Sequence, residues 1–397
     1  MEREVLTLEF SKRMEHCGTG VFSVLARMKR ERIAAGERVI DLSVGAPNIP
    51  PAQHIIDALV QSAQDKRNYV YALNDTQELQ EAVCGWYQRR YGVKIDGASE
   101  MVSLLGSQDG LSHIAFSIVD PGDLVLVPDP CYPIFSDGPL LAGAELYFMP
   151  QNRENGYVVD LKAIPEEVAR RAKFMIVSYP SNPVTSIAPE SFYRELVDFA
   201  RKYDIIVLHD NAYSELVFDG LKCGSFLQYE GAKEVGIEFN SLSKTYGLAG
   251  ARIGFALGNP KVISMLRALK SNMDYGMFLP MQKAAVAALT GPQDCVEFTR
   301  KAYEKRRDVL VDGLNAVGWH IEKPKATMFV WAELPELYAN SVEFTKELLE
   351  KAGVLVTPGS SFGPSGEGHV RMALVQDEAD MRFAIGQIDA SGILKRG

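Results

Sequence analysis

Short apolar runs alternate with amphipathic segments through the middle of this chain. The apolar runs lie at 101–105, 124–128, 174–179, 205–210 and 235–239, and polar loops and segments of helical periodicity separate them. Apolar runs of this length between helices are typical of parallel strands that are covered on both faces. We therefore predict an α/β fold in which a mostly parallel sheet is sandwiched by helices.

The two ends of the sequence have a different pattern. An amphipathic stretch at 21–35 precedes a short strand and a Gly/Pro break, IDLSVGAPNIPP, at 40–51. Beyond about residue 294, a long amphipathic helix is followed by short strands that alternate with helices, at 328–332, 354–357 and 369–373. This mixture predicts a second, smaller α+β domain.

Composition excludes several classes of protein. The 397 residues are 47% hydrophobic and 23% charged with a net charge of -9, so nucleic-acid binding has no electrostatic support. No apolar stretch is long enough to span a membrane, and the first twenty residues lack the apolar core of a signal peptide. The five cysteines are scattered without a CxxC pair, which fits a reducing cytoplasm, and the six histidines show no metal-ligand spacing. His209, in a buried run, is expected to be satisfied by its neighbours.

The segment SLSKTYGLAGAR, Ser241 to Arg252, carries the most informative chemistry. Lys244 follows a predicted buried strand, where desolvation lowers the pKa of an amine and makes it a nucleophile toward a carbonyl group. The hydroxyls of Ser241 and Ser243 and the guanidinium of Arg252 would suit a phosphate beside it. A surface lysine in a Ser/Gly turn is the alternative, and for SLSK alone it is preferred.

Other polar residues also follow predicted strands. Ser107 and Gln108 open a helix after 101–105, where free amides could bind phosphate or form a simple cap. Asp210 ends an apolar strand, so a pyridinium nitrogen or a salt bridge must keep its carboxylate charged. Asn182 and Tyr213 lie in the loops after two strands, where they could donate to a ring oxygen.

Two further residues have chemistry that suits a small substrate or a flat ring. Arg371 lies in the apolar strand GHVRMAL and could bind a carboxylate through two nitrogens or form an internal ion pair. Tyr132, in DPCYP, could stack on a flat ring, although an aromatic residue between prolines is usually packing. Ligands of parallel sheets bind beyond the carboxyl ends of the strands, where most of these residues fall.

Together, these motifs resemble the class I/II aminotransferases of the pyridoxal-phosphate fold type I superfamily, over nearly the whole chain. The resemblance implies a homodimeric enzyme that uses pyridoxal 5'-phosphate (PLP) to move an amino group between an L-amino acid and a 2-oxo acid. It also implies three parts: an N-terminal arm with part of the small domain (1–48), a large cofactor-binding domain (49–290) and a small C-terminal domain (291–397).

The resemblance assigns a role to each candidate residue. Lys244 would bind the cofactor covalently and move the substrate proton, and Asp210 would pair with the ring nitrogen. The remaining contacts would be Tyr213 and Asn182 to the ring oxygen, Tyr132 to the ring face, Ser107, Gln108, Ser241, Ser243 and Arg252 to the phosphate, and Arg371 with the backbone of Gly45 to the substrate carboxylate. Tyr71, favoured over Tyr69, would reach the phosphate of a partner subunit, with the active sites at the interface.

Within the family, the segments GSQDGLSHIAF, LVPDPCYPIF and LKSNMDYGMFLPMQKAA are similar to the LL-diaminopimelate aminotransferase-like branch. That branch is expected to have a lysine where Gln108 stands and a tyrosine near Gly20. These departures leave alanine, aspartate, glutamate or an aromatic amino acid open as donors. A carbon–sulfur β-lyase on the same fold and a non-catalytic cofactor-binding regulator are the alternative functions.

Overall fold

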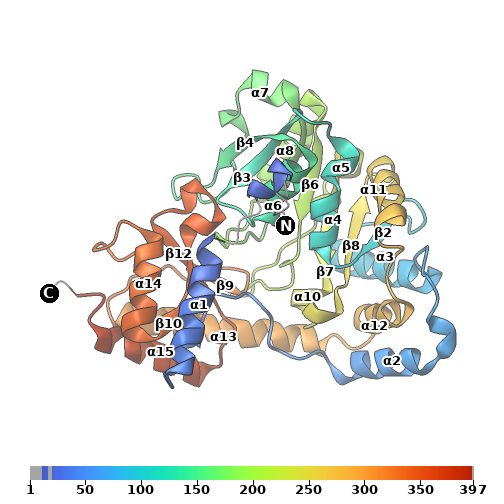
Figure 1. The fold of residues 1–397 in the computed structure, drawn as a ribbon. Helices are drawn as coiled ribbons and strands as arrows, with labels where there is room; N and C mark the ends of the chain where they lie inside the picture. The colour runs from blue at the N-terminus through green and yellow to red at the C-terminus, as the bar shows by residue number, and fades with distance from the viewer. Residues whose placement is uncertain (1–10, 17–19, 396–397) are drawn as a thin grey trace, which may run out of the picture.

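A seven-stranded sheet forms the centre of the larger part of the molecule. The computed structural model describes residues 11–16 and 20–395 (Figure 1). The strands are ordered β2–β8–β7–β6–β5–β3–β4, and all neighbours are parallel except β8, which is antiparallel to β2 and β7. Their bounds are β2 Met101–Leu104, β3 Leu124–Asp129, β4 Glu145–Pro150, β5 Ala172–Ser178, β6 Ile206–Asp210, β7 Gly236–Ser241 and β8 Gly254–Gly258.

Helices cover both faces of this sheet because alternate strand residues point to opposite sides. Phe174 and Ile176 of β5 belong to a core beneath one set of helices, α4 Ser107–His113, α5 Ala115–Ile118, α6 Ile134–Ala142 and α11 Pro260–Met273. Met175 and Val177 belong to the core of the opposite face, beneath α2 Gln53–Gln64, α3 Gln77–Tyr91, α8 Glu190–Tyr203 and α12 Leu279–Thr290. Short helices α7 Glu166–Arg171, α9 Ala232–Val235 and α10 Leu242–Thr245 lie in the connections.

The smaller part of the molecule is built from both early and late segments of the chain. Its antiparallel sheet is ordered β11–β12–β9, with bounds β9 Phe329–Glu333, β11 Thr357–Pro358 and β12 His369–Ala373. A second, parallel pair joins β1 Ile40–Asp41 to β10 Val354–Leu355. The accompanying helices are α1 Gly20–Ala34, α13 Asp294–Ala316, α14 Ser341–Ala352 and α15 Glu378–Ser391. The long α13 extends from this part toward α12 (Figure 1).

The predicted fold class is confirmed: a mostly parallel sheet is flanked by helices, and a small antiparallel sheet accompanies it. One predicted element was wrong in detail. The strand expected at 354–357 is divided, because residues 354–355 pair with β1 whereas residues 357–358 pair with β12. Lys244 follows the buried strand β7 and lies in the one-turn helix α10. There the hydroxyl of Ser241 accepts the N–H of Ser243 at 3.2 Å and caps the new helix.

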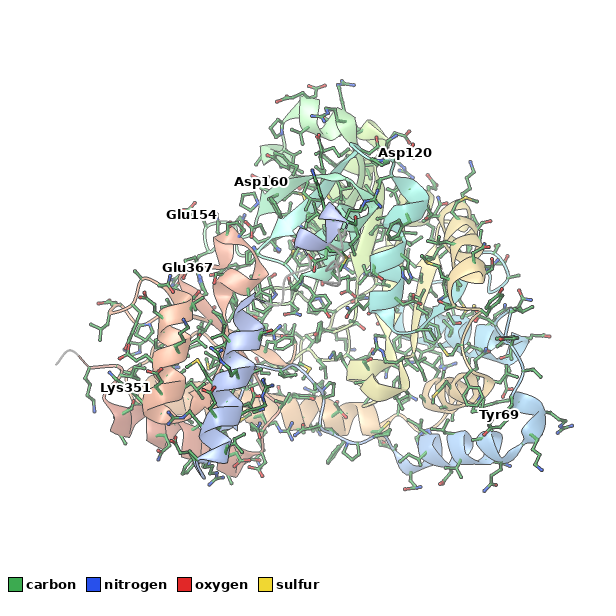
Figure 2. All side chains as sticks on the ribbon, in the orientation of Figure 1. Tyr69, Asp120, Glu154, Asp160, Lys351 and Glu367 are labelled. Carbon is green, nitrogen blue, oxygen red and sulfur yellow. The ribbon has the colours of Figure 1, made fainter. Side chains whose placement is uncertain are left out.

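No helix in the described ranges is long and apolar enough to cross a membrane. Side chains of both parts of the molecule extend into the space between them (Figure 2).

Candidate active site

Lys244 lies at the centre of a group of charged residues at the carboxyl ends of the central strands. Its Nζ donates a hydrogen bond to the carbonyl oxygen of Gly45 at 3.0 Å. Burial lowers the pKa of Lys244 to about 8, and the nearby cations Arg371 and Arg252 act in the same direction, whereas Asp210 opposes them. The amine can therefore lose its proton near neutral pH, as a nucleophile or a base requires.

Asp210 is the last residue of β6 and is only 5% exposed. One of its oxygens accepts the backbone N–H of Ala212, but the buried Oδ1 has no hydrogen-bond partner within residues 11–16 and 20–395. Burial raises the pKa of this carboxyl group to about 6. A buried carboxylate oxygen without a partner is costly, so the site fits a ligand that brings a cationic donor, such as a protonated ring nitrogen.

Arg371 and Asn182 meet from opposite sides of the site. Nη1 of Arg371 donates to Oδ1 of Asn182 at 2.9 Å, and Nη2 donates to the carbonyl oxygen of Ser43 at 3.0 Å. The guanidinium carbon lies 4.2 Å from the ring centre of Phe329 and 4.6 Å from that of Phe362. Burial lowers the pKa of Arg371 to about 10, which leaves it charged at neutral pH. Its Nε, buried and unpaired within the described part of the chain, remains available to an anion.

Tyr213 and Tyr132 line the same space. The ring of Tyr213 packs against Phe329 with centres 5.8 Å apart, and burial raises the pKa of its phenol far above the ordinary value. The hydroxyl of Tyr132 donates to Oε1 of Gln108 at 2.7 Å. Burial also raises the pKa of Tyr132, and the charges of Asp210, Arg371 and Arg252 influence it, so these groups share one region.

Donors suited to a phosphate lie where α4 and α10 begin. Gly106, with φ of +81°, precedes Ser107, and a Cβ there would lie 2.3 Å from Nη2 of Arg252. A Cβ at Gly254 would lie 2.6 Å from the backbone nitrogen of Ser107. Glycine is favoured at Gly106 because of its positive φ and at Gly254 because another backbone segment approaches so closely. Ser241 and Ser243 are buried in the neighbouring turn.

The structure therefore brings together all of the predicted site residues except Tyr71. That side chain is 80% exposed and lies beside Tyr275, with ring centres 5.3 Å apart. The sequence did not indicate Ser43, Phe329 or Phe362 around Arg371. Ser43 contributes a backbone oxygen, which no residue type reveals, and Phe362 ends a short 3-10 helix, Gly359–Phe362, outside the predicted strands. The related branch is expected to have a tyrosine near Gly20. Side chains of that stretch lie outside the described residues.

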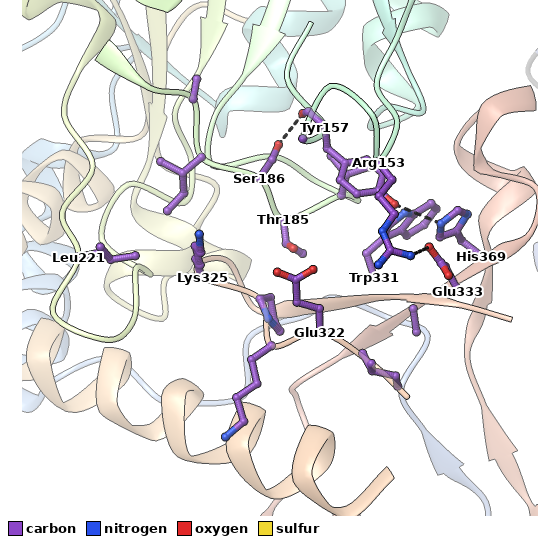
Figure 3. A pocket seen from close by; sticks show the side chains of 18 of the residues that line it. Arg153, Tyr157, Thr185, Ser186, Leu221, Glu322, Lys325, Trp331, Glu333 and His369 are labelled. Atoms are coloured by element: carbon purple, nitrogen blue, oxygen red, sulfur yellow. Dashed lines mark hydrogen bonds and ion pairs between the residues drawn. The ribbon is translucent and has the colours of Figure 1, made fainter. Parts of the chain in front are cut away.

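A cavity of about 550 Å³ is lined by residues of both parts of the molecule (Figure 3). Thr185 of the loop that carries Asn182 forms one wall, and Trp331, paired with Arg371 across β9 and β12, forms another. Arg153 and Glu333 form an ion pair of 3.1 Å beside it, and the hydroxyl of Tyr157 lies 3.3 Å from Nε2 of His369. Lys244 is not among the residues that line this cavity.

Comparisons with known proteins agree with this geometry. Residues 37–388 match the family model for aminotransferase class I and II. An LL-diaminopimelate aminotransferase of Moorella thermoacetica is 49% identical over 366 residues, which cover 91% of this chain and 94% of that protein. The substrate-bound BacF structure from Bacillus subtilis is 36% identical with a TM-score of 0.91, covering 96% of this chain and 98% of that one. A probable N-succinyldiaminopimelate aminotransferase from Thermus thermophilus is 34% identical with a TM-score of 0.88, covering 94% and 100%.

The fold and the site define a fold type I enzyme that uses PLP. The chain belongs to the class I and II aminotransferases. It is a transaminase that acts on amino acids and 2-oxo acids, and among curated proteins it is similar to the LL-diaminopimelate aminotransferases. The β-lyase and the non-catalytic regulator are not needed to explain any of these findings.

Proposed function

We propose that the residues gathered around Lys244 bind PLP and perform transamination. The observation that carries this assignment is Asp210, whose buried Oδ1 has no partner in the part of the chain that the structure describes. A protonated ring nitrogen would provide that partner. When bound, PLP supplies an electron sink for the negative charge left at the substrate Cα after its proton is removed.

Each residue then has a role that its surroundings support. Lys244, with a pKa of about 8, would take the proton from the substrate Cα and deliver it to the C4′ carbon of the cofactor. Arg371 binds the α-carboxylate through its free N–H groups, beside the backbone of Gly45, and so fixes the orientation of the breaking bond. Asn182 and Tyr213 donate to the ring oxygen, and Tyr132 lies on the ring face.

The phosphate is held by Ser107, Gln108, Ser241, Ser243 and Arg252. Ser107 and Gln108 lie in the first turn of α4, Ser241 caps α10 and Ser243 lies within it, and together with Arg252 they combine hydroxyl and amide donors with one guanidinium. Such donors match the oxygen acceptors of a phosphate and partly neutralise its charge.

We infer that LL-diaminopimelate is the amino donor, with a 2-oxo acid as acceptor. The relative of that name at 49% identity supports this choice. The amide N–H groups of Gln108 remain with the phosphate, because its Oε1 accepts the hydroxyl of Tyr132.

A homodimer would complete the site. Tyr71 is 80% exposed and lies among other exposed apolar side chains, of which Tyr69 is 64%, Val70 61%, Leu73 62% and Tyr275 52% exposed. A continuous apolar surface of this kind is typical of an interface. A second copy would cover it, and Tyr71 would then reach the partner's phosphate. The two-domain division at residues 49 and 290 and a cytoplasmic location complete the proposal.

A half-reaction screen tests the function and the substrate together. The PLP form is mixed with LL-diaminopimelate, alanine, aspartate, glutamate and tyrosine in turn, and the loss of PLP absorbance is timed. We expect LL-diaminopimelate to react fastest and Lys244→Ala to abolish the reaction. A faster reaction with another amino acid would refute the substrate, whereas turnover by Lys244→Ala would refute the proposed mechanism.

A further inference from the structure

Glu238 is a fully buried carboxylate that the chemistry proposed above does not use. It lies on β7 and is 0% exposed. Its Oε1 accepts the hydroxyls of Tyr87 at 2.9 Å and Ser225 at 2.8 Å. Its Oε2 accepts the backbone N–H of Phe226 at 2.8 Å and lies 3.0 Å from Nδ1 of His209. Both oxygens are thus saturated, which is the arrangement that keeps a buried carboxylate in place.

His209 connects this carboxylate to the strand end that carries Asp210. His209 is also 0% exposed, and it stands opposite Glu238 in the register of β6 and β7. Since Glu238 accepts, Nδ1 of His209 carries the proton, and the other nitrogen, Nε2, lies 3.5 Å from the hydroxyl of Tyr193. The imidazole is held at both ends, directly before Asp210 in the chain.

Two consequences follow for Asp210. The hydrogen bonds to Glu238 connect α3, the 225–228 turn and β6 to β7, the strand that leads into Lys244. They therefore fix the distance between Asp210 and Lys244, the two groups proposed to face the cofactor ring. The negative charge of Glu238 also favours positive charge on a group bound to Asp210, because little water is present to screen it. Both effects act on a ring nitrogen that carries a proton.

We propose that Glu238, acting through His209, is a positioning residue that holds Asp210 in register for the cofactor ring nitrogen and favours the protonated form of that nitrogen. This inference rests on the proposed PLP function. A residue that merely stabilises the fold would affect any bound cofactor equally. A residue that acts through Asp210 affects only a cofactor that has a ring nitrogen.

The test compares PLP with 1-deaza-pyridoxal 5'-phosphate, in which carbon replaces the ring nitrogen. The dissociation constant of each compound is measured by absorbance titration of the apoprotein, for wild type and Glu238→Gln. We expect Glu238→Gln to raise the constant for PLP about tenfold, equal to about 1.4 kcal/mol, and that for the deaza compound less than about twofold.

The control is Asp219→Asn, which removes an exposed carboxylate from its ion pair with the buried guanidinium of Arg307, at 2.6 Å. It should lower the melting temperature and leave the ratio of the two constants unchanged. If Glu238→Gln raised the dissociation constants of both compounds by the same factor, or changed neither, the inference would be overturned. If that variant does not fold, Tyr87→Phe removes one donor to Glu238, and a smaller loss confined to PLP is expected; equal losses would again overturn it. Failure of the wild type to bind PLP would instead refute the proposed function.

Discussion

Replacing Arg371 by lysine tests how the site recognises a carboxylate. The variant keeps the positive charge but has one nitrogen in place of three. In the wild type, separate nitrogens bind Asn182 at 2.9 Å and Ser43 at 3.0 Å, and Nε remains free. A single ammonium group cannot hold these two acceptors and also bind the substrate through two parallel hydrogen bonds.

The size of the effect follows from the hydrogen bonds lost. One charge-assisted hydrogen bond is worth about 1.5–3 kcal/mol, so the loss of one should lower kcat/KM roughly 10- to 150-fold. The flanking rings of Phe329 and Phe362, at 4.2 and 4.6 Å, exclude the water that could otherwise replace it. We expect Arg371→Lys to fall within this range.

The assay is steady-state kcat/KM for the amino donor, together with the dissociation constant for PLP. The latter should change by less than about threefold, because the phosphate donors lie elsewhere and a shift of that size is worth well under 1 kcal/mol. Arg153→Lys is the matched control, since Arg153 forms an exposed ion pair with Glu333 and such pairs contribute little. A kcat/KM for Arg371→Lys equal to that of the control would refute this account of carboxylate binding.

The remaining predictions concern the other groups of the site. Because the folded-state pKa of Asp210 is raised from 3.8 to about 6, the folded apoprotein binds this proton more tightly than the unfolded chain, and its stability should fall as pH rises from about 4 to 6. This fall in the free energy of unfolding should reach about 3 kcal/mol, and Asp210→Asn should remove it. Urea unfolding at several pH values measures the effect, and an unchanged pH dependence in the variant would contradict the reasoning. Gly106→Ala should displace Arg252, since the new Cβ would lie 2.3 Å from Nη2, and should weaken PLP binding about tenfold in an absorbance titration; unaltered affinity would show that the arginine does not contact the phosphate. Mixed dimers of Lys244→Ala and Tyr71→Phe subunits should regain one intact site each and recover activity that neither variant has alone, and no recovery would refute the shared site.

The sequence predicted the residues whose chemistry is unusual for their position. Asp210 ends one apolar run and Lys244 lies in the segment after another, and parallel strands place such residues at one edge of a sheet. The architecture was also predictable, because short apolar runs between helical segments are typical of a parallel sheet covered on both faces. The split of residues 354–357 between two sheets was not, because strand partners depend on the tertiary arrangement and leave no local pattern.

Contacts between distant segments were also beyond the sequence. Asn182 and Arg371 are 189 positions apart, and nothing in either segment names the other as a partner. Glu238 shows the same limit in the core. Within an apolar run, a single glutamate is usually expected to face solvent, yet four donors from three other segments allow it to be buried completely. The role of Tyr71 stays a prediction, because its proposed contact lies on a second chain.

The pairing of β1 with β10 has a consequence for synthesis of the protein. Position 40 must find position 354, which is 314 residues further along, whereas all seven strands of the central sheet lie between residues 101 and 258. On the ribosome, the central sheet can assemble while β1 still lacks its partner. Ile40, 4% exposed in the finished molecule, must wait in an unpaired segment until translation has passed residue 355. Nascent chains arrested before that point should therefore be good substrates for chaperones that bind exposed apolar segments.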